Sequence, residues 1–263
     1  MRIDRDLVRR VEHSGAQQAT LQAAALATVA PGSGATAVPL DGGALVAFGH
    51  GRYVNRAMGL GLNGTSADEI VATINGFYSQ RRVPPSLEIC PWADPTLFTA
   101  LGADGYRLER FRNVYAHDLT ALPSEGPTQI ATLDADTAAE RKRLLAGDTP
   151  VGSEARRVSD EFCDALTGTQ DKVDLLALVD GMPAACGSLT VVGSVGWLGG
   201  AATDPARRGR GLQSALVAHR LRLATEMGCT LAAATALPDG QSARNLERLG
   251  FTLLYTQAVM TRA

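Results

Sequence analysis

The spacing of apolar residues along the first half of the chain predicts an alternation of helices and strands. Helices are expected where apolar residues recur every three or four positions, over 4–29, 67–81 and 95–103. Strands are expected where short apolar or alternating runs occur, over 44–48, 54–62, 87–90 and 106–119. Pro84 and Pro85 end the second helix, and Gly and Pro at 31–34 end the first. The pattern is that of a mixed α/β domain.

The second half starts the alternation again. Its predicted helices cover 137–145, 154–166, 211–227 and 242–249. Its predicted strands cover 130–133, 174–179, 184–192, 197–203, 230–235 and 251–260. The intervening segment 121–128 is rich in Pro, Gly and Ser, which is typical of a linker. We therefore expect two domains, 1–122 and 128–263.

Two short motifs indicate that the halves are copies of each other. Leu101-x-x-x-Gly105-Tyr106 matches Leu246-x-x-x-Gly250-Phe251 in residue type and spacing. Each motif stands before a long closing strand, and the order of elements in the two halves is similar. We interpret this as a diverged tandem duplication. An unrelated α/β domain in the first half is the alternative.

The composition of the chain argues against several classes of function. The chain of 263 residues is 45% hydrophobic and 20% charged, which is ordinary for a globular protein with a sizeable core. A formal net charge of -2 argues against a nucleic-acid-binding protein, which needs a dominant basic face. The four cysteines are widely separated and form no C-x-x-C pair, so we expect no metal site.

The ends and apolar stretches of the chain bear on its location. Residues after Met1 are charged and lack the apolar core of a signal peptide. The apolar stretch 19–29 is too short to span a bilayer. We therefore expect a cytoplasmic protein with no membrane partner. The oligomeric state stays open, with a homodimer as one option.

The segment 203–213 lies between a predicted strand and a long predicted helix. This position exposes unpaired backbone N–H groups at the positive end of a helix dipole, which favours binding of a phosphate. Gly209 and Gly211 allow close backbone approach, and three arginines of the segment add positive charge. A solvated basic turn is the alternative. A dinucleotide-binding turn fits poorly, because Ser214 stands where the third glycine of that motif belongs.

The wider context of this turn resembles a known family. Arg208-Gly209-Arg210-Gly211-Leu212-Gln213 is similar to the acyl-CoA pyrophosphate loop of the GNAT superfamily of N-acetyltransferases, whose pattern is Arg/Gln-x-x-Gly-x-Gly/Ala. The preceding Thr203-x-Pro205 and the later Asn-Leu-Glu-Arg-Leu-Gly-Phe at 245–251 also stand where this family carries them. Gln213 replaces the last Gly/Ala. Leu246 replaces the tyrosine that protonates the leaving thiolate in many members.

This resemblance implies a fold and a cofactor. Both halves would be GNAT-like domains of the α/β (α+β) class, each with a mixed central sheet flanked by helices. In the second half two splayed strands would hold acetyl-CoA as cosubstrate. The implied cofactor-binding residues lie on the strand end, the loop and the following helices: Ala201, Ala202, Thr203, Arg208, Gly209, Arg210, Gly211, Leu212, Gln213 and Asn245. A backbone N–H near Ala202 or Thr203 would polarise the acetyl carbonyl.

The corresponding loop of the first half, 62–69, lacks these features. It has one glycine and no basic side chain, and Ser66 with Glu69 forms a capping-box pattern. Side-chain oxygens would then occupy the amides that a phosphate needs. We expect this half not to bind CoA, but to pack on the catalytic half and wall the acceptor pocket.

Candidates for proton transfer are few. Tyr255, on the closing strand, is the nearest C-terminal phenol that could replace the missing acid; the alternative is a packing residue, the more frequent role of strand tyrosines. Asp160 belongs to an acidic cluster where the family lines its acceptor pocket, and could accept a proton from a cationic amine. The alternative is a solvated acidic face. His219 is interpreted as a packed helical residue rather than a base.

Three functions are compatible with these observations. The first is transfer of an acetyl group from acetyl-CoA to an amine of an unknown small molecule or peptide. The second is a non-catalytic acyl-CoA-binding or sensing protein, because Leu246 and the lack of a clear base weaken the case for catalysis. The third is a structural or interaction protein with a degenerate loop.

Overall fold

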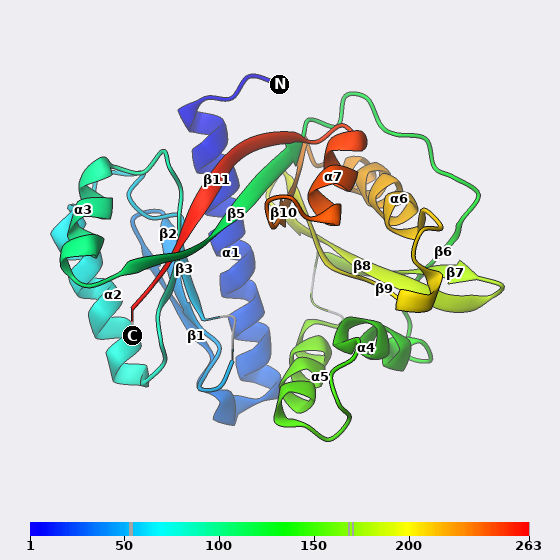
Figure 1. Cartoon of the computed structure of the whole chain (residues 1–263), viewed down its shortest axis with the longest axis horizontal. Helices are drawn as coiled ribbons and strands as arrows, with labels where there is room; N and C mark the ends of the chain where they lie inside the picture. The colour runs from blue at the N-terminus through cyan, green and yellow to red at the C-terminus, as the bar shows by residue number, and fades with distance from the viewer. Residues whose placement is uncertain (53–54, 168, 170, 263) are drawn as a thin grey trace. The chain divides into compact units, whose positions relative to one another are not determined.

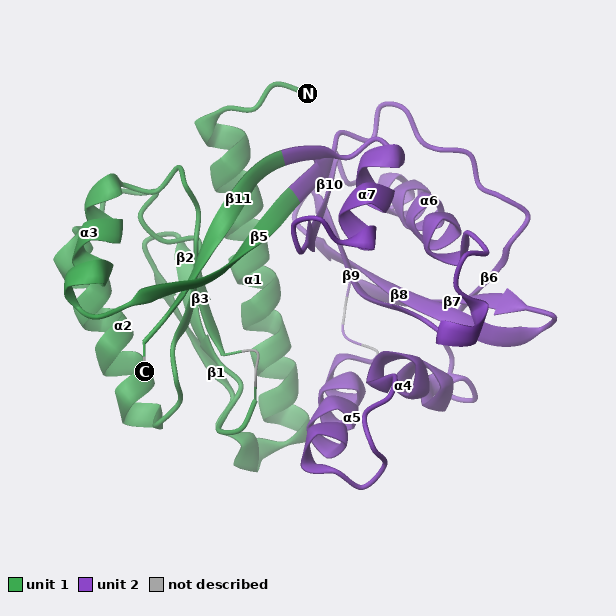
Figure 2. Cartoon of the chain, in the orientation of Figure 1, with its two compact units in different colours: residues 1–114, 254–263 green, residues 115–253 purple. Residues whose placement is uncertain are grey.

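The computed structural model describes residues 1–52, 55–167, 169 and 171–262. The described residues form two compact units, one of 1–114 with 254–263 and the other of 115–253 (Figure 2). The helices are α1 (Arg5–Val29), α2 (Ala67–Arg81), α3 (Pro95–Ala103), α4 (Ala138–Ala146), α5 (Glu154–Leu166), α6 (Leu212–Glu226) and α7 (Gln241–Arg248) (Figure 1). None of these helices is both long and apolar enough to cross a membrane.

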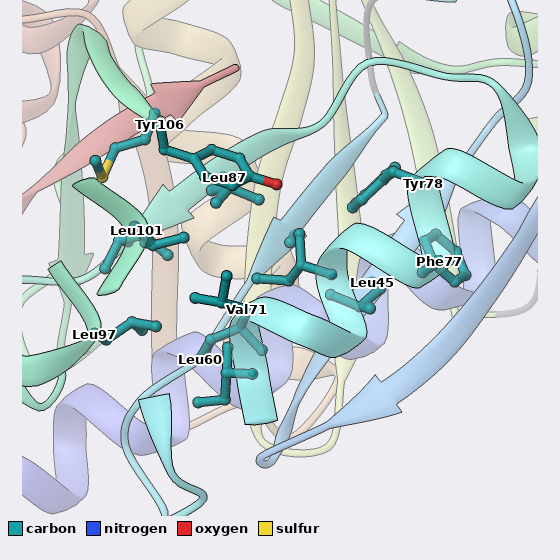
Figure 3. Packing of buried hydrophobic residues seen from close by; sticks show 14 of the residues in the cluster. Leu45, Leu60, Val71, Phe77, Tyr78, Leu87, Leu97, Leu101 and Tyr106 are labelled. Atoms are coloured by element: carbon teal, nitrogen blue, oxygen red, sulfur yellow. The ribbon is translucent and has the colours of Figure 1, made fainter. Parts of the chain in front are cut away.

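The strands of unit 1 form a sheet in the order β1-β2-β3-β4-β11-β5. They are β1 (Thr36–Leu40), β2 (Gly43–Ala47), β3 (Arg56–Met58), β4 (Ser86–Ile89), β11 (Thr252–Thr261) and β5 (Arg107–His117). Helices α2 and α3 pack on this sheet through a cluster of buried apolar residues (Figure 3). Leu45 and Leu87 of the sheet lie in this cluster with Leu97 of α3.

Helix ends in unit 1 follow from local side chains. The Asp4 carboxylate accepts a hydrogen bond from Leu7 N at 3.0 Å and starts α1. Asp94 in the same way caps α3, which has Pro95 at its first position. The helices predicted around 67–81 and 95–103 are confirmed.

The strands of unit 2 follow in the same strand order as β10-β9-β8-β7-β6. Its strands are β6 (Gln129–Thr132), β7 (Lys172–Val179), β8 (Met182–Val192), β9 (Val195–Thr203) and β10 (Leu231–Ala236). Asp180 and Gly181 adopt positive φ in the predicted turn between β7 and β8. Helix α6 covers one face of this sheet and α4 the other, as the separate apolar clusters around Leu216 and Leu144 show (Figure 1).

The two halves of the sequence repeat one order of elements. In the first half this order is β1-β2-β3-α2-β4-α3-β5, and in the second half it is β7-β8-β9-α6-β10-α7-β11. The repeat matches the duplication inferred from the Leu-x-x-x-Gly motifs, whose glycines, Gly105 and Gly250, both have positive φ. The predicted mixed α/β class is confirmed.

The last strand joins unit 1. Ala258 of β11 lies opposite Ile89 of β4 in an antiparallel pairing, and residues 254–263 belong to the first compact unit. The sequence grouped these residues with the second domain, 128–263. Strand periodicity identifies β11 but carries no information about which strand it pairs with.

Two strand predictions of the first half need correction. Strand β1 was not expected, because Pro39 interrupts its pattern; the structure places it at the sheet edge, where a proline is tolerated. The predicted strand 54–62 is reduced to Arg56–Met58, and Val54 lies outside the described residues. Gly59 and Gly61 have positive φ, which ends the strand early.

Candidate active site

Strands β9 and β10 of unit 2 are paired over only part of their length and then separate. Their parallel pairing runs from Val195 to Leu198 of β9 and ends opposite Ala234. Strand β9 continues to Thr203, still paired on its other side with β8. Within the described residues the edge of β9 beyond Leu198 therefore faces no neighbouring strand. Its free backbone groups can pair with a ligand.

A β-bulge shapes this end of β9. The pairing shifts between Cys186 and Ser188 of β8, so that β9 carries one extra residue there. Gly200 has φ +55, and a Cβ at this position would lie 2.6 Å from Ser188 Oγ. Only glycine fits, and the bulge turns the following residues, Ala201 and Ala202, toward the space left by β10.

A buried arginine supports the bulge from the α6 side. Arg220 Nη1 donates to Ser188 O at 3.1 Å and to Gly199 O at 3.3 Å, and its Nε donates to Leu216 O at 3.0 Å. A Cβ on Gly187 would lie 2.9 Å from its guanidinium carbon. Burial lowers the pKa of Arg220 to about 10, so it stays charged at neutral pH. These bonds fix the carbonyls of β8 and β9 at the bulge.

A second polar cluster supports the bulge from the α4 side. Arg141 Nε lies 3.2 Å from Asp174 Oδ1, which also accepts a 2.6 Å hydrogen bond from Ser188 Oγ. Lys172 forms an ion pair with the same carboxylate. Burial and the nearby Arg141 lower the pKa of Lys172. The buried charges of the cluster hold β7 and β8 against α4.

The loop after β9 leaves its backbone amides exposed. Asp204 Oδ1 accepts from Ala206 N at 3.0 Å and starts a short 3-10 turn. Gly209 and Gly211 then have φ +77 and +74, with open space where a side chain would be. These glycines are required by the backbone conformation rather than by packing. In the part of the chain that the structure describes, the amides of 209–214 donate to no protein acceptor.

Helix α7 is tied to the start of α6 through one glutamine. Asn245 Nδ2 donates to Gln213 Oε1 at 2.6 Å, and Gln213 Nε2 donates to Ser242 Oγ at 3.3 Å. Gln213, which departs from the Gly/Ala of the sequence pattern, therefore has a structural role. It positions α7 beside the loop.

These elements enclose a cleft of about 950 Å³. All ten residues predicted to bind the cofactor line it, from Ala201 to Asn245. Residues outside the predicted cofactor-binding set also line it: Leu144, Leu145, Gly147, Asp148, Cys186, Pro205, Arg207, Ser214, Gln241, Ser242 and Arg248. Those from the end of α4 carry no motif, so no sequence signal pointed to them.

The cysteine in the cleft is not a nucleophile. Cys186 Sγ donates a weak hydrogen bond to Gly200 O at 3.5 Å, and burial raises the pKa of its thiol to about 11. A protonated thiol without a neighbouring base is unreactive.

The two candidates for proton transfer do not line the cleft. Asp160, on α5, forms an ion pair with Arg156 Nε at 2.9 Å. Tyr255 is buried in unit 1, where desolvation and the nearby Glu12 raise the pKa of its phenol well above the usual value. Leu246 is buried in the apolar cluster of α6 and β10, which also contains Tyr115, whose hydroxyl donates to Glu247 Oε1 at 2.9 Å.

His219 has a polar partner that the sequence did not reveal. Its Nδ1 lies 2.9 Å from Glu125 Oε1, and Arg222 Nη2 lies 2.8 Å from the other oxygen of Glu125. The histidine is half-buried rather than packed in an apolar stripe. These contacts fix the predicted linker 121–128 to α6.

The loop of unit 1 that corresponds to 208–213 has its amides occupied. Asp41 Oδ2 accepts from Leu62 N at 2.9 Å and from Asn63 N at 3.3 Å, and its Oδ1 accepts from Thr65 N at 3.1 Å. Ser66 Oγ accepts from Glu69 N at 3.3 Å, as the capping pattern predicted. A carboxylate of the chain itself thus takes the place that an anion would occupy.

Comparison with known proteins agrees with the geometry of unit 2. Residues 141–251 match the model of the acetyltransferase (GNAT) family. Residues 141–251 form a GNAT domain. No curated protein sequence matches the chain. The resemblance inferred from the loop and the 245–251 segment is confirmed.

Solved structures extend the likeness to the whole chain. A GCN5-related N-acetyltransferase from Kribbella flavida is 22% identical, with a TM-score of 0.69 over 97% of this chain and 95% of that chain. One from Sphaerobacter thermophilus is 14% identical, with a TM-score of 0.58 over 79% of this chain and 71% of that chain. A tandem GNAT protein from the clavulanic acid biosynthesis pathway is 16% identical, with a TM-score of 0.55 over 82% and 72%. These similarities show a shared fold, including the GNAT-like repeat of the first half.

Proposed function

We propose that this protein transfers an acetyl group from acetyl-CoA to a primary amine of a small molecule or peptide. The observation that carries the proposal is the single cleft that joins the free edge of β9, the free amides of 209–214 and the arginines of the loop. A CoA thioester carries matching groups in the same order: an amide-containing arm and a diphosphate. The GNAT family of residues 141–251 supports acyl transfer as the reaction.

The donor would be held mainly by backbone groups. The two amides of its pantetheine arm would pair with β9 near Ala201 and Thr203, where the strand lacks a neighbour. Its diphosphate would accept hydrogen bonds from the amides of 209–214 at the start of α6. Arg208 and Arg210 add charge at the same point. Gly209 and Gly211 keep side chains out of this space.

The chemistry needs positioning more than reactive side chains. The neutral amine nitrogen would attack the thioester carbon, and the carbonyl oxygen would become an oxyanion that accepts from the N–H of Ala202 or Thr203. Collapse of this intermediate breaks the C–S bond and releases CoA as a thiolate, while the nitrogen loses its proton. The bulge at Gly200, fixed by Arg220, would hold these N–H groups in place.

Two proton transfers complete the reaction. Because Asp160 lies outside the cleft, we propose that it accepts the proton from the amine through water. Tyr255 belongs to unit 1 and also lies outside the cleft, so we propose that water, rather than this phenol, protonates the thiolate. Asp160 also forms an ion pair with Arg156. Because water can carry the proton, replacement of Asp160 should have only a small effect on the rate of transfer.

A non-catalytic acyl-CoA-binding or sensing protein is the second candidate. It is favoured by the burial of Leu246 and by the cleft lining, in which Asp148 is the one carboxylate among the described residues. Such a protein would use the same cleft and the same loop. The two candidates differ in turnover rather than in binding.

Calorimetric titration with acetyl-CoA, followed by an assay of thiol release over a panel of amines, polyamines, aminoglycosides and peptides, tests the proposal. One-site binding with amine-dependent release of CoA supports the transferase. Binding without release under any amine supports the sensor. Failure of the folded protein to bind acetyl-CoA would overturn both.

A further inference from the structure

Unit 1 contains a pocket that the proposed acetyl transfer does not use. The pocket has a volume of about 400 Å³ and lies between α1 and the turns that follow β1 and β3. Helix α1 contributes four ionisable residues to its lining, Arg9, Arg10, Glu12 and His13. These positions fall within about one helical turn, so side chains of opposite charge share one opening.

Glu12 is the most deeply buried residue of this set, with 2% of its surface exposed. Its Oε1 accepts a hydrogen bond from Gln257 Nε2 at 2.8 Å, whereas its Oε2 accepts no well-aligned hydrogen bond from the part of the chain that the structure describes. Burial raises the pKa of the carboxyl group to about 7, and the described groups that shift this pKa most bring no positive charge. A buried carboxylate without a cation is unfavourable, so a positively charged donor in the pocket would stabilise it.

The more accessible part of the pocket carries positive charge. Arg9 and Arg10 are half-buried, and both guanidinium groups belong to the lining. Arg9 Nε and Nη2 donate to Leu62 O at 3.0 and 2.7 Å, which fixes the side chain and leaves Nη1 without an acceptor among the described residues. A fixed guanidinium with a free N–H group is suited to a carboxylate.

Hydrogen bonds between its lining residues hold the walls of the pocket in place. His13 Nδ1 lies 2.8 Å from Gly42 O, and Asn63 Nδ2 donates to Asp41 O at 2.6 Å. A Cβ on Gly42 would lie 2.3 Å from Asn63 Nδ2, so the turn and the loop meet at a glycine. The pocket is therefore formed before any ligand binds, which lowers the entropic cost of binding.

We propose that this pocket binds a free α-amino acid, with its ammonium group on Glu12 and its carboxylate on Arg9. The inference goes beyond the proposed function, because it concerns unit 1 and a ligand other than acetyl-CoA. An α-amino acid carries both charges on groups attached to one carbon atom, and Arg9 and Glu12 are neighbours three residues apart on α1. A simple acid would leave Glu12 without a cation, and a simple amine would be repelled by Arg9 and Arg10. The volume of the pocket leaves room for a side chain.

Calorimetric titration of the full chain with each standard L-amino acid tests the proposal at pH 8, where Glu12 is ionised. The amino acid that binds most tightly is then compared with its decarboxylated amine and with its deaminated acid. We expect one binding site per chain for the amino acid. Each of the two truncated compounds should bind about tenfold to a hundredfold more weakly, the range for a charge-assisted hydrogen bond.

Two variants separate the two ends of the ligand. Glu12→Gln should weaken binding of the amino acid by the same factor without weakening that of the deaminated acid. Arg9→Gln should weaken binding of the amino acid without weakening that of the decarboxylated amine. Arg5→Gln is the matched control, because Arg5 lies one turn earlier on α1 and does not line the pocket. It should leave all three affinities unchanged.

Three results would overturn the proposal. Failure of the folded wild type to bind any of the amino acids at millimolar concentration would show that the pocket is not a site of this class. Equal affinity for the amino acid and either truncated compound would show that one of its charges is not recognised. Unchanged binding in both Glu12→Gln and Arg9→Gln would place the amino acid elsewhere, such as in the unit 2 cleft. None of these results bears on the binding of acetyl-CoA, so the proposed function is tested separately.

Discussion

The loop before α2 and the loop before α6 hold equivalent positions in the two repeats, and their amides have different partners. Before α2, the amides of Leu62, Asn63 and Thr65 donate to the Asp41 carboxylate. Before α6, the amides of 209–214 donate to no acceptor among the residues that the structure describes, and arginines line the same cleft. The comparison shows two outcomes for the same loop. In the second copy the loop amides stay available for an anionic ligand, and in the first copy the Asp41 carboxylate takes the place of such a ligand. We infer that the first copy serves as a scaffold.

The largest effect should come from a carboxylate placed in the loop before α6. The same change in the loop before α2 serves as the control. Gly211→Glu puts a charged side chain among the free amides and should weaken acetyl-CoA binding by about a hundredfold or more, because it adds repulsion and removes phosphate contacts. Gly64→Glu is the matched change in unit 1, at another glycine with positive φ and open surroundings. It should leave the affinity unchanged. Calorimetry on both folded variants checks this, and a loss of binding in Gly64→Glu would contradict the comparison.

Unit 1 also contains a buried acidic side chain whose protonation affects the stability of the fold. Burial raises the pKa of Glu12 in unit 1 from 4.5 to about 7, and Gln257 Nε2 donates to its Oε1 at 2.8 Å. The folded state therefore binds the proton more tightly than the unfolded chain. The stability that protonation gives is complete below pH 4.5 and is lost as the pH rises to about 7, by an amount on the order of 3 kcal/mol.

Glu12→Gln removes this titration. The variant should gain stability relative to the wild type as the pH rises from 5 to 8, measured by urea denaturation. Glu154→Gln, at an exposed position of α5, is the control and should follow the wild type at every pH. A wild type whose unit 1 stability does not fall over this range would refute the account.

Removal of the internal anion should destabilise unit 1 without creating a cofactor site. Asp41→Asn leaves the amides of Leu62, Asn63 and Thr65 with weaker acceptors, at a cost of about 1–3 kcal/mol. The loop still lacks basic side chains, so acetyl-CoA should bind with one site per chain as before. Denaturation gives the first quantity and calorimetric stoichiometry the second. A second binding site in the variant would show that Asp41 alone blocks CoA.

The smallest effects should come from the two candidates for proton transfer, neither of which lines the cleft. Asp160→Asn should lower kcat by no more than about tenfold, because water can substitute, and Tyr255→Phe should leave kcat unchanged. The KM for acetyl-CoA should stay unchanged in both variants. Steady-state measurement of thiol release gives both quantities. A tenfold or greater loss of kcat in Tyr255→Phe would contradict the assignment of that proton transfer to water.

Most of the secondary structure and the cofactor loop could be predicted from the sequence, because their signals are local. Apolar periodicity gives helices and strands, and the prolines and glycines give their ends. The positive φ at Gly209 and Gly211 follows from a turn that only glycine adopts readily. Strand β1 was missed because Pro39 interrupts the same local signal.

The tertiary structure decided the partners of residues far apart in the chain. The sequence carried no sign that Asp41 binds a loop more than twenty residues later, that β11 pairs with β4, or that Leu144 walls the cleft. These contacts depend on which surfaces meet when the sheets form, and many partners satisfy the same local pattern. The sequence therefore indicated which loops have the form of an anion site. Packing decided that the amides of one loop donate to Asp41 and that the amides of the other remain available to a ligand.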